Sequence, residues 1–132
     1  MAIDYGRKRC GVAVTDPLRI AVHPLETVLR KDLLAFLEKY MLQEEVDELV
    51  LGKAFHSDGR PMEISEEIDR FAAELRKKFP GLAVNFQDEN FSSQRASKLL
   101  VEAGLPRQKR REKGRVDRIS AVLILQDYLG HI

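Results

Sequence analysis

The stretch that most constrains the fold runs from Ala2 to Asp16, AIDYGRKRCGVAVTD, and places a carboxylate inside an apolar strand. The strand that holds Asp4 turns through Gly6 into a second apolar strand that contains Gly11. The bases of the turn are Arg7, Lys8 and Arg9. The pattern predicts a β-hairpin with positive charge at its tip. Because an ionised carboxylate in a partly buried strand is costly without compensation, Asp4 is expected to hold a ligand.

A simpler interpretation is a surface hairpin in which Asp4 only caps the turn. Ile3 on the first strand and Val12, Ala13 and Val14 on its partner favour a buried sheet instead. The capping role therefore ranks second.

Length and composition limit the number of domains and the class of protein that the chain can form. The chain has 132 residues, 44% hydrophobic and 33% charged, as in ordinary soluble proteins. This length predicts a single domain over residues 1–132, too small for two lobes that close on a ligand. Neither a membrane-spanning run nor a secretory signal is recognised in the sequence, and the single cysteine, Cys10, is expected in the core of a cytoplasmic protein.

The formal net charge of +1 hides a strongly basic segment near the C-terminus. The bases of this segment are Arg107, Lys109, Arg110, Arg111, Lys113 and Arg115. Glu112 is its one acid, so the segment carries +5 and the rest of the chain −4. A basic segment on a near-neutral protein indicates contact with a polyanion. The alternative is a solvated loop without a partner.

Beyond the hairpin, strand-like and helix-like segments alternate along the chain. Strands are expected at 20–28, 48–52 and 82–86, and helices at 33–41, 64–79, from Ser92 or Ser93 to 103, and 117–129. The last helix carries apolar residues on nearly every side, so it is expected to be largely buried. This order predicts an α/β domain whose mixed sheet opens with an antiparallel hairpin and has helices packed on it.

Four acidic residues fall where strands end or a helix begins. Asp4 lies on the first strand, Asp88 and Glu89 follow the strand at 82–86, and Asp117 begins the last helix. Ligands of open α/β sheets bind beyond the carboxyl ends of the strands, so these acids can converge on one edge. Clustered carboxylates repel one another unless a hard divalent cation holds them, which predicts Mg²⁺ or Mn²⁺. The three histidines lack the spacing of a zinc site.

Simpler roles exist for some of these acids. Asp117 can cap the last helix, and we expect it to do so as well as to bind metal. Asp88 and Glu89, taken alone, are explained by a polar loop between a strand and a helix. As a cluster, the acids could hold two ions ~4 Å apart that activate a water and stabilise the leaving oxygen of a phosphodiester. The cluster therefore predicts a nuclease.

Several motifs in their order along the chain resemble the YqgF/RuvX family. They are IDYGRKRCGVAVTD with the following PLRIAVHPLETV, VLGK with HSDG, the pair DE after an apolar strand, and VDRISAVLILQDYL. The resemblance implies a ribonuclease-H-like fold related to the RuvC resolvases and metal-dependent nuclease activity. By motif position it implies that Asp4, Glu89 and Asp117 are catalytic, with Asp88 beside them at the metal.

The resemblance implies two substrates, the 5′ end of pre-16S rRNA in ribosome biogenesis and Holliday junctions in DNA. Pre-ribosomal particles are then expected partners, and the protein is expected as a monomer or homodimer, because two symmetric cuts in a junction need a dimer. Two other function classes remain open. One is a nucleic-acid-binding factor without turnover, and the other is an actin-like phosphotransferase, which the length of the chain disfavours. Backbone recognition by the basic residues does not separate RNA from DNA.

Overall fold

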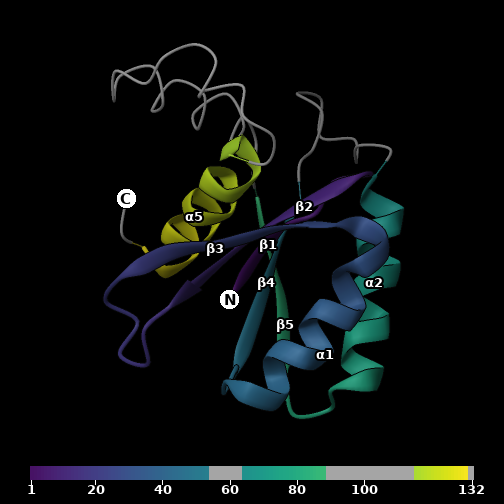
Figure 1. Ribbon diagram of the computed structural model, residues 1–132, viewed down its shortest axis with the longest axis horizontal. Helices are drawn as coiled ribbons and strands as arrows, with labels where there is room; N and C mark the ends of the chain where they lie inside the picture. Colours follow the sequence, from purple (N-terminus) through teal and green to yellow (C-terminus); the bar gives the residue numbers. More distant parts are fainter. Residues whose placement is uncertain (54–63, 89–114, 131–132) are drawn as a thin grey trace.

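The computed structural model describes residues 1–53, 64–88 and 115–130, with side chains described from Arg118 onward in the last segment (Figure 1). Within these ranges the strands are β1 (Ala2–Asp4), β2 (Arg9–Thr15), β3 (Val22–Leu29), β4 (Glu48–Lys53) and β5 (Ala83–Asp88). The helices are α1 (Leu33–Gln43), α2 (Ser65–Lys78) and α5 (Arg115–Leu129), and a 3-10 turn, η1 (Arg30–Asp32), precedes α1.

The strands form one mixed sheet in the order β3-β2-β1-β4-β5. Strand β2 is antiparallel to β1 and to β3, whereas β4 is parallel to β1 and to β5. This arrangement confirms the predicted mixed sheet that opens with an antiparallel hairpin. It also brings the ends of three parallel strands together, at Asp4, Lys53 and Asp88, and we call this end of the sheet the carboxyl edge.

Side chains alternate between the two faces of the sheet, and each face has its own core. Figure 1 shows α5 on one face and α1 with α2 on the other. The core below α1 and α2 includes the buried residues Ile3, Leu37, Leu51, Ile68 and Leu75. The core below α5 includes Ala2, Ala13, Val50, Ala121 and Ile124. Every residue of α5 from 118 to 129 is buried or half-buried, which confirms that the last helix is largely covered.

Two features of the edge strand β3 explain how it accommodates Pro24. The pairing of β2 with β3 shifts register between Val12 and Ala13, and Pro24 pairs at that irregularity. Strand β3 is the outermost strand on its side and pairs only with β2, and prolines within sheets are confined to such edge strands and to bulges.

The structure changes some predicted boundaries. Strand β5 continues two residues beyond the predicted end and includes Asp88. Helix α5 begins at Arg115, so Asp117 lies inside the first turn, and the prediction that it is the N-cap was wrong. Cys10 is fully buried, as predicted. The predicted helix up to residue 103 lies outside the described residues. Among the described helices, none has the length and apolar character needed to cross a membrane.

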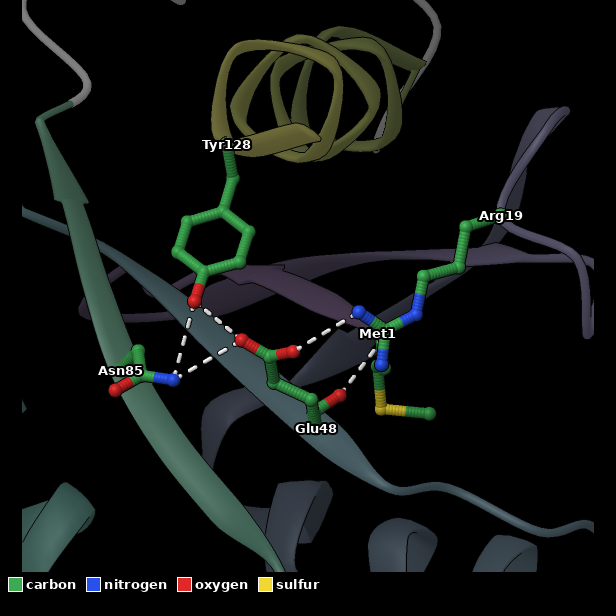
Figure 2. A network of polar contacts seen from close by, with 5 residues as sticks. All are labelled: Met1, Arg19, Glu48, Asn85 and Tyr128. Carbon is green, nitrogen blue, oxygen red and sulfur yellow. Dashed lines mark hydrogen bonds and ion pairs between the residues drawn. The ribbon is translucent and has the colours of Figure 1, made fainter. Parts of the chain in front are cut away.

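A polar network fixes the far end of α5 at the opposite end of the sheet from the carboxyl edge (Figure 2). The hydroxyl of Tyr128, in the last turn of α5, donates to the carboxylate of Glu48 at the start of β4. Asn85 of β5 donates to the same carboxylate oxygen over 3.0 Å, and Arg19 lies 3.4 Å from the other oxygen. The network therefore ties α5 to β4 and β5 and sets the position of the helix along the sheet.

We predict that Tyr128→Phe lowers the free energy of unfolding near neutral pH by about 1–2 kcal/mol, because it removes a hydrogen bond to a charged group. The bond from Tyr128 lowers the pKa of Glu48, so this stabilisation is present above the ordinary value of 4.5 and is lost as pH falls through the folded pKa. The same bond raises the pKa of the Tyr128 hydroxyl. Its contribution to the stability of the fold is therefore present below pH 10.0, the ordinary pKa, and is lost as the pH rises through the raised pKa.

The destabilisation by Tyr128→Phe should therefore be greatest between about pH 5 and pH 10 and shrink outside this window. Urea denaturation at several pH values measures it. Tyr40→Phe is the matched control, since the Tyr40 ring stacks on Phe36 at 6.0 Å. A destabilisation by Tyr128→Phe that does not vary with pH would contradict the role given to the Glu48 bond.

Candidate active site

Asp4 is the last residue of β1 and is half-buried on the α5 side of the sheet. Successive side chains of a strand point to opposite faces of the sheet. Ala2 packs in the core below α5 and Ile3 in the core below α1 and α2, so Asp4 lies on the α5 side. Gly11 of β2 lies directly opposite Asp4. Ile3 of β1 pairs with Leu51 of β4, so the next residue of β4, Gly52, lies level with Asp4. Both neighbours on this face lack side chains, and both are buried.

Asp88 reaches the same edge but lies on the other face of the sheet. It shares a face with Phe86, whose ring lies under the Lys53 ammonium at 5.0 Å and near the Arg76 guanidinium of α2 at 5.7 Å. Lys53 is the register partner of Asp88 and binds Asp69 of α2 at 2.7 Å. The sheet therefore separates Asp88 from Asp4. Glu89 lies outside the described residues.

Asp117 lies in the first turn of α5, on the helix that covers the face of Asp4. Tyr128, near the helix end, is anchored at the start of β4. Asp117 precedes it by about three turns, ~16 Å at a rise of 1.5 Å per residue. The five steps from Glu48 to Lys53 span a similar ~17 Å. The first turn of α5 therefore lies at the level of the carboxyl edge, as Figure 1 shows.

The predicted nucleic-acid-binding residues fall in two groups. In the hairpin turn, Arg7 and Lys8 are exposed, and Arg9 is half-buried at the start of β2. The turn directly follows Asp4, so its charge borders the carboxyl edge. Arg115 is the first residue of α5. The residues of the basic segment that lie outside the described residues are Arg107, Lys109, Arg110, Arg111 and Lys113.

A polar cluster that the sequence did not predict lies behind the hairpin turn. Tyr5 is buried with its ring 5.2 Å from that of Phe71, and its hydroxyl donates to Glu67 of α2 over 3.4 Å. The same Glu67 carboxylate forms an ion pair with Arg30 of η1. The bond with Tyr5 and the charge of Glu67 raise the pKa of Arg30, and burial raises the pKa of Tyr5. The only signal in the sequence was an aromatic residue directly after Asp4.

The donors at this edge fit a hard divalent cation. Asp4 supplies carboxylate oxygens, the ligands that magnesium prefers, and its neighbours Gly11 and Gly52 place no side chain against it. Within the part of the chain that the structure describes, no three acidic, histidine or cysteine side chains lie close enough to hold a metal. A complete site on this face therefore needs acids in addition to the described ones.

Comparison with known proteins connects this site to a family. Residues 1–131 match the profile of RuvX, described as Holliday junction resolvase. A protein of Porphyromonas gingivalis named "Putative pre-16S rRNA nuclease" is 45% identical over 131 residues, covering 99% of this chain and 95% of the relative. Proteins of the same name from Flavobacterium psychrophilum and Christiangramia forsetii are 36% and 41% identical, covering 98% of this chain and 94% and 96% of theirs. The matches confirm the predicted resemblance, and with the strand order they confirm the ribonuclease-H-like fold.

Proposed function

The chain belongs to the RuvX family, and from this membership we propose that it is a metal-dependent endonuclease that hydrolyses phosphodiester bonds in structured nucleic acid. The proposed substrate is the 5′ end of pre-16S rRNA, because relatives of 36–45% identity carry that activity in their names. The protein would act in the cytoplasm, on pre-ribosomal particles.

The observation that carries the proposal is the environment of Asp4. A half-buried carboxylate ends the central strand, both of its neighbours on that face are glycines, and the first turn of α5 lies at its level. The arrangement suits a carboxylate that binds a ligand from solution.

We assign Asp4, Glu89 and Asp117 to the metal site. When bound, Mg²⁺ or Mn²⁺ would activate the attacking water and stabilise the leaving oxygen. The carboxylates position that cation, and the bases of the hairpin turn and of the basic segment hold the phosphate backbone by charge. Half-burial of Asp4 limits competition from water for its oxygens.

The acid that follows β5 can be tested by a pair of variants. Asn85 and Gln87 lie on the α5 side and Asp88 on the other, and this alternation is the reason for proposing Glu89 as the catalytic acid. We expect Glu89→Gln to reduce cleavage at least ~100-fold and Asp88→Asn less than tenfold, because only a metal ligand contributes several kcal/mol to the transition state. A larger loss for Asp88→Asn would instead assign the metal ligand to Asp88, the other residue predicted from the sequence.

The direct test of function is cleavage of end-labelled RNA that carries the 5′ leader of pre-16S rRNA, next to a four-way DNA junction. Each is incubated with magnesium, with manganese or with chelator. Metal-dependent cutting of the RNA, lost in Asp117→Asn, supports the proposal. Binding of both substrates without any cutting would contradict it and favour a non-catalytic binding factor.

A second candidate function is Holliday junction resolution, favoured by the description of the family that the chain matches. Two symmetric cuts require a homodimer, whereas processing of one RNA end is possible for a monomer. Cutting of the junction in preference to the RNA, by a protein that sediments as a dimer, would favour the resolvase.

A further inference from the structure

Two turns that are distant in the sequence meet at one corner of the carboxyl edge. The turn between β1 and β2 carries Arg7 and Lys8, and η1 carries Arg30 and Lys31. The backbone N–H of Arg30 donates to the carbonyl oxygen of Lys8 over 2.8 Å. This bond holds the two turns against each other. We call Arg7, Lys8, Arg30 and Lys31 the basic corner.

The basic corner is attached firmly to the core. The ion pair of Arg30 with Glu67 links η1 to α2, and Glu67 also accepts the hydroxyl bond of the buried Tyr5. The ring of Tyr5 packs on Phe71. Because these contacts hold the backbone of both turns in place, little further order has to be imposed when a ligand binds.

Positive charge at the corner exceeds what the adjacent acids neutralise. Arg7, Lys8 and Lys31 are exposed, and the side chain of Arg30 is 44% exposed despite its ion pair. Arg7 has a polar partner of its own; beside the other three cations, Lys8, Arg30 and Lys31, the acids in the described structure are Glu67 and Asp32, which leaves a charge of +1. Exposed cations that repel one another on a fixed backbone favour a ligand with closely spaced negative charges, such as a phosphate backbone.

The place of the corner in the sheet sets its distance from Asp4. Strand β3, which leads into η1, is two strands away from β1. At ~4.8 Å between neighbouring strands, η1 lies ~10 Å to the side of β1, and Arg30 lies three residues, also ~10 Å, beyond Thr27, which is level with Asp4, so Arg30 is ~14 Å from Asp4. Phosphates of one nucleic-acid strand are spaced ~3.4 Å apart along the helix axis, so ~14 Å corresponds to about four nucleotides.

We infer that the basic corner binds the substrate backbone, with Arg30 and Lys31 as binding residues about four nucleotides from the bond that is cut. This inference rests on the proposed nuclease function, because it takes Asp4 as the cutting site. The nucleic acid would then follow the carboxyl edge from the side of β3 toward β1.

The test compares Lys31→Ala with Lys77→Ala, which removes an exposed lysine near the other end of α2. Binding of a labelled RNA hairpin with the 5′ leader is measured by fluorescence anisotropy over a salt series, in chelator so that no cutting occurs. Lys31→Ala should lower the slope of log K against log salt by ~0.7–0.9, the value of one phosphate contact, and Lys77→Ala should not. In cleavage assays Lys31→Ala should raise KM several-fold at unchanged kcat.

Substrate length gives a second readout. RNA trimmed to one nucleotide beyond the cut on the side of the corner should bind equally well to wild type and Lys31→Ala. An unchanged slope for Lys31→Ala, or an equal loss for Lys77→Ala, in an enzyme that still cleaves would overturn the basic corner and leave the nuclease standing. A slope lowered only by Lys31→Ala, in a protein that cuts nothing, would support the corner as a backbone-binding site and contradict the nuclease.

Discussion

Asp4→Asn is expected to abolish metal-dependent cleavage, with a loss of about 10³-fold or more in kcat. Asparagine keeps the size of the side chain but removes the negative charge that holds the cation. Loss of about 4 kcal/mol of transition-state stabilisation corresponds to a factor of this size. Initial rates on the RNA substrate at saturating magnesium measure it.

The same variant should keep its fold and its affinity for nucleic acid. Asparagine has nearly the size and shape of aspartate, so the half-buried position at the end of β1 takes it without repacking. The melting temperature of the metal-free protein should therefore change little, and RNA binding in chelator should change less than threefold. Asp47→Asn, an exposed aspartate before β4, serves as the control with full activity. Normal cleavage by Asp4→Asn would exclude Asp4 from the metal site.

Gly6→Ala is expected to have the largest effect on stability for the smallest chemical change. A Cβ atom at residue 6 would lie 2.3 Å from the backbone carbonyl oxygen of Arg9, closer than Cβ contacts in proteins allow. Arg9 cannot yield easily, because it begins β2 and pairs with Leu29 of β3. The turn itself must move, at a cost of about 1–3 kcal/mol, or roughly 4–10 °C in melting temperature.

Displacement of this turn should also reduce cleavage, because the turn joins Asp4 to Arg7 and Lys8. Gly81→Ala is the matched control, since a Cβ there meets nothing within 4 Å. It should be neutral or stabilise by up to ~1 kcal/mol through the entropy of the unfolded chain. Thermal unfolding of both variants with retained two-state behaviour measures the difference. Equal stability of the two variants would show that the turn adapts at no cost.

Local sequence patterns were sufficient for most elements of the described fold. The alternation around Asp4 predicted the β1–β2 hairpin, and the apolar stripe of α2 predicted its buried face. These signals depend on residues within one strand or a few helical turns, where a period of 2 or 3.6 is imposed by backbone geometry. The predicted ends of helices and strands were less accurate. Both β5 and α5 extend beyond their predicted bounds, because tertiary packing extends them past the residues that show a local pattern.

The sequence by itself determined which chemistry the protein has available, namely acids at element ends and bases in the hairpin turn and near the C-terminus. Only the tertiary structure decided which of these groups share a face. Parallel pairing of β1, β4 and β5 put Asp4 and Asp88 at one edge, and the pleat put them on opposite sides. The hydrogen bond between Arg30 and Lys8 and the ion pair between Arg30 and Glu67 could not be predicted from the sequence either. The order of β1, β4 and β5 arises from contacts between segments that are distant in the chain, and no periodicity within one segment encodes it.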